Sequence, residues 1–268
     1  MLHRKFLLLI LFLSFKFLLR GAGTTYAVIV GVSNYQRFSF GKGDLRYSSR
    51  DAQLFYNYMV SPNGGKIPIN QTILLIDEQA SKSSILEALN IFEKADKEDR
   101  VIFFFSGHGD AGKFLPYDTD GYSPMLTHKE LKKAFRLSKA SSKICIADAC
   151  FAGSIRNQDF SYTQHHQIDT MNHLNSERNV LLFLACLPNQ ISVEYKELQQ
   201  GVFTYYLLKG FLGPADVNHD KVITAFEIYN YVSKYMVEYT TKKHPNEKPQ
   251  TPMMFGTFSK DLPIIVND

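Results

Sequence analysis

The chain of 268 residues contains only three cysteines and shows no basic stripe, internal repeat or low-complexity tract. Three cysteines are too few for the disulfide framework of a small secreted domain. The net charge of +4 is mild and the lysines and arginines are scattered, so nothing indicates a nucleic-acid partner. A hydrophobic share of 45% and a charged share of 21% are typical of globular chains. The length is enough for one α/β domain with a substantial core.

The apolar run near the N-terminus is too short to cross a bilayer comfortably. It covers residues 6–15, follows a basic start, and is followed by the small residues 21–23. This arrangement predicts a secretory signal peptide over residues 1–23 and therefore an exported protein, periplasmic or secreted. Lys16 and Arg20 are unusual just before a cleavage site. They favour the alternative of an uncleaved N-terminal anchor, which would be the only link to a membrane.

Apolar runs alternate with helical patterns along the rest of the chain. Strands are predicted at 26–32, 72–76, 101–105, 144–147, 180–185 and near 253–258. Helices are predicted at 51–59, 83–95, 202–211 and 224–239, with another opened by a capping box at Thr127–Glu130. Continuous apolar runs indicate strands buried on both faces, and βαβα alternation favours a mostly parallel sheet covered by helices.

Two of the predicted strands end in small polar turns that carry a histidine and a cysteine. His108 lies between two glycines after the run 101–105, and Cys150 follows Asp148 after the run 144–147. Carboxyl ends of parallel strands meet at one edge of a sheet, where active sites of such folds gather. The pair therefore predicts a cysteine hydrolase.

The chemistry explains why these residue types occur together. A free thiol has a pKa of about 8.5, so little thiolate exists near neutrality without a base. His108 would take the proton from Cys150 and later protonate the leaving amine. The backbone N–H groups of Gly109 and Cys150 could form an oxyanion hole. No third residue that orients His108 is evident, and a dyad is expected.

The segments Phe-Ser-Gly-His108-Gly and Asp148-Ala-Cys150-Phe-Ala-Gly resemble the histidine and cysteine motifs of the caspase-like (peptidase C14) superfamily. Here 42 residues separate His108 from Cys150, and an aspartate stands two residues before the cysteine. That aspartate is the pattern of metacaspases, paracaspases and their bacterial relatives. Further segments that resemble the family lie at 26–35, 49–52, 201–206, 215–220 and 250–252.

The resemblance implies a caspase-like three-layer sandwich around a mostly parallel sheet. It implies a peptidase domain over 24–268, with a large-subunit-like half at 24–155 and a small-subunit-like half at 179–268. The polar stretch 156–178 between them is expected to be a long linker loop. Related proteins are often cut in this region, so Arg156 and Arg178 are candidate self-cleavage sites. An uncut surface loop is the alternative.

Asp148 carries the predicted substrate specificity. On an extended strand end it would point to the same side as Cys150, and a carboxylate there would favour a basic side chain. The resemblance to metacaspase-like families implies that Asp51, Ser106 and Asp148 line the first pocket. Glu194, in a Ser-x-Glu segment like that of paracaspase-like members, is expected to add another acid.

Caspases instead hold an aspartate with arginines, and no comparable set is evident although Arg50 adjoins Asp51. Cleavage after Arg or Lys is therefore predicted. Each pocket residue has a structural alternative. Asp51 could cap the first helix, Asp148 could be a buried hydrogen-bonded acid, Ser106 could cap its strand, and Glu194 could be a solvated loop charge.

The segment 216–227 has the acidic spacing of a calcium loop, with Asp216, Asn218, Asp220 and Glu227 at positions 1, 3, 5 and 12. Lys221 stands where glycine is normally required. The pair Thr224–Glu227 also fits a capping box, which explains Glu227 without a metal. No cofactor is expected for the reaction, and calcium remains an alternative.

The sequence thus predicts a cysteine endopeptidase that acts on proteins or peptides after Arg or Lys through an acyl-enzyme. Three alternatives remain open: a catalytically silent or latent interaction module, an aspartate-specific protease, and a hydrolase of non-peptide acyl groups. An acidic pocket fits a basic peptide side chain better than a neutral ester.

Overall fold

The computed structural model describes residues 23–37, 44–62, 64–110, 112–149, 179–187, 190 and 192–267. A six-stranded sheet runs through it in the order β12-β8-β7-β3-β1-β2. Its strands are β1 (Thr25–Gly31), β2 (Thr72–Ile76), β3 (Arg100–Ser106), β7 (Ser142–Asp148), β8 (Val180–Leu184) and β12 (Met253–Thr257). Only β12 in this sheet runs antiparallel to its neighbour. All six strands were predicted, with ends that differ by at most two residues.

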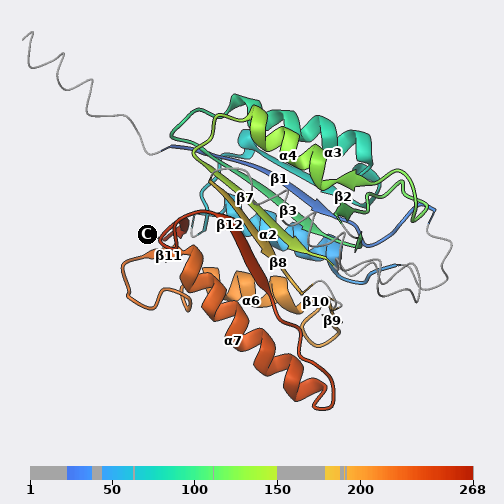
Figure 1. The fold of residues 1–268 in the computed structure, drawn as a ribbon, viewed down its shortest axis with the longest axis vertical. Coiled ribbons are helices and arrows are strands. Elements are labelled where there is room, and N and C mark those ends of the chain that lie inside the picture. Colours follow the sequence, from blue (N-terminus) through green and yellow to red (C-terminus); the bar gives the residue numbers. More distant parts are fainter. Residues whose placement is uncertain are drawn as a thin grey trace, which may run out of the picture.

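Helices cover both faces of the sheet (Figure 1). On one face lie α3 (Lys82–Leu89), which continues as the 3₁₀ helix η3 (Asn90–Lys94), and α4 (His128–Leu137). On the other face lie α2 (Ser48–Val60), α6 (Val202–Phe211) and α7 (Ala225–Lys243). The predicted three-layer sandwich around a mostly parallel sheet is therefore confirmed.

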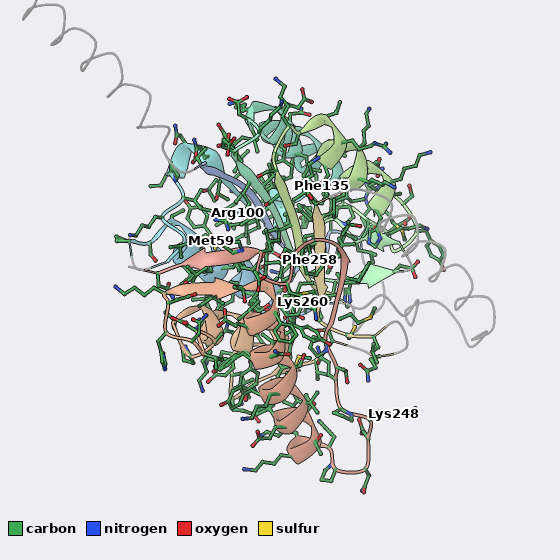
Figure 2. All side chains as sticks on the ribbon, turned by 60° about the vertical axis from the view of Figure 1, so that its left-hand side comes forward. Met59, Arg100, Phe135, Lys248, Phe258 and Lys260 are labelled. Carbon is green, nitrogen blue, oxygen red and sulfur yellow. The ribbon has the colours of Figure 1, made fainter. Side chains whose placement is uncertain are left out.

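The sheet separates two hydrophobic clusters because successive strand residues point to opposite faces. On β3, Phe103 and Phe105 pack toward α3 and α4, whereas Ile102 and Phe104 pack toward α2 and α6. Phe135 of α4 belongs to the first cluster, and Figure 2 shows it at the end of the molecule opposite Lys248. Because these strands are buried on both sides, a shift in register would move apolar side chains to the wrong face. The strand ends therefore have fixed positions relative to one another.

Both predicted capping boxes form. Thr127 accepts from the Glu130 N–H at the start of α4, and Thr224 accepts from the Glu227 N–H at the start of α7. Asp51 does not cap the first helix, because α2 begins three residues earlier and its N-cap is Tyr47. That alternative for Asp51 is wrong. The predicted helix over 83–95 exists, but only its first part is an α-helix. Its second part, Asn90–Lys94, is a 3₁₀ helix.

Short strands complete the fold. They are β4 (Gly109–Asp110), β5 (Lys113–Phe114), β6 (Leu126–Thr127), β9 (Glu194–Tyr195), β10 (Gln200–Gly201), β11 (Val222–Thr224) and β13 (Pro263–Val266). The 3₁₀ turns η1 (Ile69–Gln71) and η2 (Asp77–Gln79) flank β2. Arg100, labelled in Figure 2, donates from Nη1 to the carbonyl oxygens of Pro263 and Ile264, each at 2.9 Å. This side chain joins the amino end of β3 to β13.

Candidate active site

The carboxyl ends of β3 and β7 lie side by side. Ser106 is in register with Asp148, and the Gly107 N–H donates to the Asp148 carbonyl oxygen at 3.2 Å. His108 follows Ser106 by two residues, and Cys150 follows Asp148 by two. Cys150 itself lies outside the described residues, so its role as nucleophile stays a prediction. The register nevertheless brings together the two strand ends from which both residues follow.

His108 is held by Tyr35, a residue to which the sequence analysis gave no role. The backbone N–H of His108 donates to Tyr35 Oη at 2.7 Å. The two rings have centroids 5.2 Å apart and planes tilted by 34°. Tyr35 is only 8% exposed, and this burial raises the pKa of its phenol. A neutral tyrosine therefore fixes both the backbone and one ring face of His108.

The loop that carries Tyr35 is itself anchored by two carboxylates. The Tyr35 N–H donates to Asp44 Oδ1 at 3.3 Å. Asp77 Oδ1 accepts from the N–H groups of Ser33 at 2.8 Å and Asn34 at 3.0 Å. The only sequence signal for Tyr35 is its place four residues after the end of β1, at the same edge of the sheet as His108. Such proximity becomes visible only once the strand order is known.

Gly109 is buried in β4, next to His108. Leu115 N–H donates to the His108 carbonyl oxygen at 3.0 Å, and the following cross-strand pair joins Gly109 to Phe114. Hydrogen-bonded and non-hydrogen-bonded pairs alternate in an antiparallel ladder. The Gly109 N–H is therefore directed away from β5, as an oxyanion donor would be. The His108 N–H is already engaged by Tyr35.

Asp51 lies inside α2, with its side chain turned into the protein and 1% exposed. Its carboxylate accepts from Ser106 Oγ at 3.2 Å and from the Gly201 N–H at 3.0 Å. Burial raises the pKa of Asp51 well above its ordinary value, and the nearby charge of Asp148 raises it further. Ser106 thus contacts the acid with which it was predicted to line a pocket.

Asp148, at the end of β7, is 5% exposed. Its Oδ1 accepts from Ser192 Oγ at 2.5 Å, and its Oδ2 accepts from Thr204 Oγ1 at 2.7 Å and the Thr204 N–H at 3.1 Å. Burial raises the pKa of Asp148, and these hydrogen bonds oppose the rise. Asp148 is thus a buried hydrogen-bonded acid, as its structural alternative held, and its role in a substrate pocket stays a prediction.

The two carboxylates converge on Gly201, the N-cap of α6. A Cβ atom on Gly201 would lie 2.3 Å from Asp148 Oδ2 and 3.0 Å from Asp51 Oδ2. Glycine is therefore needed here for a close approach rather than for an unusual backbone angle. The first N–H groups of a helix have no partner within the helix and attract negative charge. The N-terminus of α6 thereby stabilises an acidic pair.

Glu194 of β9 supports the amino end of α2. Its carboxylate accepts from the N–H groups of Arg46 at 2.8 Å and Tyr47 at 2.9 Å. Ser48 Oγ also lies within hydrogen-bond distance, at 3.4 Å. Glu194 is half-buried, so it is not the solvated loop charge of its structural alternative. Its charge also contributes to the raised pKa values of Asp51 and Asp148.

In the candidate calcium loop, Asp216 and Glu227 accept hydrogen bonds from backbone N–H groups. Asp216 Oδ2 accepts from the Lys221 N–H at 2.9 Å, and Glu227 closes the capping box of α7. Lys221 has φ +69°, the left-handed conformation for which glycine is favoured. Within the described ranges, no group of three or more His, Cys, Asp or Glu side chains could hold a metal ion.

The two other cysteines have structural positions. Cys145 is buried in β7, and burial raises the pKa of its thiol. Cys186 Sγ donates to the carbonyl oxygens of Ala149 at 3.6 Å and Gln190 at 3.4 Å. Both therefore behave as buried side chains.

Several predictions fall outside the described residues. They concern the N-terminal segment up to residue 22, Cys150, and the linker with Arg156 and Arg178. Among the helices that the structure describes, none has the length and apolar character of a membrane span. The choice between signal peptide and anchor stays open.

Comparisons with known proteins agree with this geometry. The sequence model of the caspase domain family, peptidase C14, matches residues 24–263. The chain therefore belongs to the caspase domain family, whose members are cysteine peptidases. No curated protein matches the chain.

Two solved structures share the fold. The structure of protein GSU0716 from Geobacter sulfurreducens has a TM-score of 0.61 and 17% identity, covering 89% of this chain and 95% of that one. Caspase-1 from Spodoptera frugiperda has a TM-score of 0.63 and 11% identity, covering 90% of this chain and 89% of that one.

Proposed function

We propose that the protein is a cysteine endopeptidase of metacaspase or paracaspase type that cleaves after arginine or lysine. The observation that carries this proposal is the meeting of the Asp51 and Asp148 carboxylates at Gly201. They lie beside the paired strand ends from which His108 and Cys150 follow. A thiol and an imidazole supply acyl transfer, and a pair of carboxylates recognises a guanidinium or ammonium group.

The reaction uses groups of this chain and water. His108 takes the thiol proton of Cys150, and the thiolate attacks the scissile carbonyl carbon. The N–H groups of Gly109 and Cys150 stabilise the oxyanion. His108 then protonates the leaving amine, which departs and leaves a thioester on Cys150. A water molecule, deprotonated by His108, hydrolyses the thioester and regenerates the thiol.

The acidic pair favours a basic substrate residue over an acidic one. In this buried site, the charge of Asp148 already raises the cost of ionising Asp51. A third carboxylate would add to this repulsion, whereas a guanidinium would offset it. Both acids are at most 5% exposed, so a side chain or loop must move before a substrate can reach them.

The test is hydrolysis of fluorogenic peptides ending in Arg, Lys or Asp by the full chain. We expect turnover after Arg and Lys, none after Asp, and equal rates with calcium and with a chelator. Cys150→Ala should abolish turnover, whereas Cys145→Ala, a matched change at a buried cysteine, should retain it. Asp51→Asn and Asp148→Asn should raise KM for Arg peptides, because each removes an acid that can pair with the bound cation.

The other outcomes separate the alternatives. Turnover only after Asp would keep the dyad but contradict the acidic pocket. Turnover of esters without peptides would make the protein a non-peptide acyl hydrolase. If no substrate is turned over, intact mass distinguishes a latent enzyme that cuts itself at Arg156 or Arg178 from a silent binding module. The same mass determines whether residues 1–23 are removed, as expected for an exported protein.

A further inference from the structure

Asp77 stands where the carboxyl end of β2 meets two other elements. It directly follows β2 and is the first residue of the turn η2. The last residues of β1 and β2, Gly31 and Ile76, are in register. Asp77 therefore lies beside the start of the loop that follows β1. Residues 33–36 of this loop, called the Tyr35 loop below, include the residue that holds His108.

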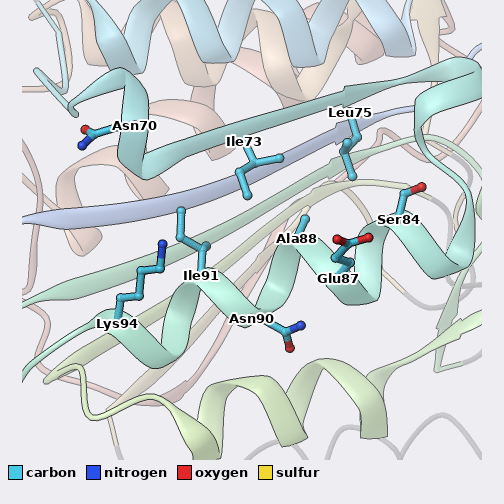
Figure 3. A pocket seen from close by; sticks show the side chains of 9 residues that line it. All are labelled: Asn70, Ile73, Leu75, Ser84, Glu87, Ala88, Asn90, Ile91 and Lys94. Carbon is cyan, nitrogen blue, oxygen red and sulfur yellow. The ribbon is translucent and has the colours of Figure 1, made fainter.

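The strand that precedes Asp77 is held along one edge and on both faces. β2 pairs with β1 over its whole length, and Leu74 packs into the cluster on the side of α2. Ile73 and Leu75 pack on the other side, toward α3 and η3. There they line an open groove of about 610 Å³ between β2 and that helix (Figure 3). β2 thus gives the Asp77 side chain a fixed base.

One carboxylate oxygen of Asp77 accepts three hydrogen bonds from two elements. Its Oδ1 accepts from the N–H groups of Ser33 at 2.8 Å and Asn34 at 3.0 Å, and from Ser49 Oγ at 2.7 Å. Ser33 and Asn34 belong to the Tyr35 loop, and Ser49 belongs to the first turn of α2. The Ser49 N–H also donates to Ser33 Oγ at 2.9 Å. Asp77 thus joins the Tyr35 loop to the amino end of α2.

The far end of the Tyr35 loop is attached to the same turn. The carbonyl oxygen of Ala80, directly after η2, accepts from the Tyr117 N–H at 2.9 Å. The carbonyl oxygen of Tyr117 in turn accepts from the Gln36 N–H at 3.0 Å. Tyr35, whose hydroxyl accepts the His108 N–H, therefore lies between two attachments of its loop to η2.

The amino end of α2 positions one of the two buried acids of the proposed pocket. Asp51 follows Ser49 by two residues, and its N–H donates to the Tyr47 carbonyl oxygen at 2.8 Å in the first turn. Asp77 holds this end of the helix through Ser49 Oγ, and Glu194 holds it through the Tyr47 N–H. A displacement of this turn would therefore move Asp51.

We propose that Asp77 is a positioning residue that aligns His108 with Asp51, the first through the Tyr35 loop and the second through α2. The inference rests on the proposed function, because it concerns the proposed base and the proposed pocket. Asp77 acts through hydrogen bonds to the loop and to Ser49, at a distance from the reacting atoms. Alignment of a base with a bound substrate is a large part of the rate that an active site supplies.

Asp77→Ala removes the shared acceptor. We expect kcat for Arg peptides to fall on the order of tenfold, because the Tyr35 loop loses an attachment. KM should rise in the same variant, because α2 loses its bond through Ser49. Asp77→Asn keeps an oxygen that can accept the same bonds and should restore most of both. The double variant Asp77→Ala/Tyr35→Phe should have the kcat of Tyr35→Phe alone, since both changes act through one N–H.

Two control variants separate positioning from a loss of stability. Asp99→Ala removes an acceptor of two backbone N–H groups, of Thr24 and Asp96, each at 2.8 Å and at the amino end of the sheet. Ile73→Ala removes packing from β2 at the groove of Figure 3. Both should lower the urea midpoint and leave kcat and KM at wild-type values. Equal kinetic changes in these controls would overturn the proposal, as would an Asp77→Ala variant in which only kcat or only KM changes.

Amide hydrogen exchange tests the inference without a substrate. Exchange at His108 and at Asp51 should be faster in Asp77→Ala than in the wild type and unchanged in Asp99→Ala. Wild-type exchange at either residue in Asp77→Ala would overturn the inference, whether or not the chain is a peptidase. Faster exchange at both residues in a chain that cleaves no peptide would support the positioning role and contradict only the proposed function.

Discussion

Tyr35 gives His108 a fixed position that a cysteine–histidine pair alone would not provide. Its hydroxyl accepts the His108 N–H, and its ring lies against the imidazole. Because the hydroxyl acts on the backbone and not on a reacting atom, Tyr35 is a positioning residue. An imidazole that must receive a proton and later return it benefits from a single orientation.

Tyr35→Phe tests this role. The change leaves the part-buried His108 N–H without the Tyr35 acceptor, which costs about 1–3 kcal/mol. If that loss is felt in the transition state, kcat falls by about tenfold for each 1.4 kcal/mol, with a smaller change in KM. The pH profile of Cys150 alkylation by iodoacetamide should also shift, and this readout needs no peptide substrate.

Tyr58→Phe is the matched control for Tyr35→Phe. Tyr58 is a buried tyrosine whose hydroxyl donates to the Phe211 carbonyl oxygen at 2.8 Å, away from His108. The Tyr58→Phe variant should be less stable than the wild type, while the pH profile of Cys150 alkylation should not change. Equal profiles for both variants and the wild type would contradict a positioning role for Tyr35.

At the scale of elements, the start of α6 affects both the stability of the fold and the proposed substrate specificity. Gly201→Ala adds a methyl group 2.3 Å from Asp148 Oδ2, so the carboxylate or the helix must shift. Overpacking of this kind costs about 1–3 kcal/mol. We expect lower stability in urea and a raised KM for Arg peptides, because the acidic pair is displaced.

Gly210→Ala in the same helix separates the two effects of Gly201→Ala. Its added methyl group would lie 2.6 Å from Ile228 Cδ1, a side-chain atom away from the two acids. This variant should change stability while KM stays at the wild-type value. A KM that rises equally in both variants would mean that α6 packing, and not the acidic pair, governs substrate binding.

Elements with long apolar runs or capping boxes were predicted from the sequence because their signals are local. The start of α7 at Thr224–Glu227 is an example, since a capping box depends on four consecutive residues. The two-residue strands β9 and β10 were missed because they are too short for any periodicity. They matter nevertheless, since they carry Glu194 and Gly201.

The sequence predicted those residues of the candidate site that belong to recognisable motifs, but not the contacts between them. Asp51 and Asp148 were identified through the resemblance, and their side chains do converge. That Asp51 meets Gly201, 150 residues later in the chain, depends on tertiary packing. Tyr35 was missed for the same reason. A hydroxyl that accepts a backbone N–H 73 residues away leaves no trace in residue spacing.

At the scale of the whole molecule, the buried acids make stability depend on pH in an uncommon direction. The pKa of Asp51 is raised in the folded protein, so the folded state binds its proton more tightly than the unfolded state. The stability that this proton contributes is fully present below the ordinary aspartate pKa of about 3.9. It is lost as the pH rises through the raised pKa.

Urea unfolding of wild type and Asp51→Asn at a series of pH values isolates this contribution. Asparagine resembles the neutral acid, so the wild type should lose stability relative to the variant as the pH rises. The exposed Asp261→Asn serves as the control for removal of one negative charge. A difference between wild type and Asp51→Asn that does not change with pH would contradict the raised pKa.

The contacts of Arg100 determine how late in synthesis the fold can be completed. Its guanidinium binds carbonyl oxygens of Pro263 and Ile264, and Pro263 leaves the ribosome 163 residues after Arg100. Until then the Arg100 guanidinium lacks two of the acceptors that it has in the folded protein. The nascent chain therefore carries the residues of the proposed active site well before its sheet is fully tied together. A chain assembled in this order is least complete while it is still beside the ribosome that makes it.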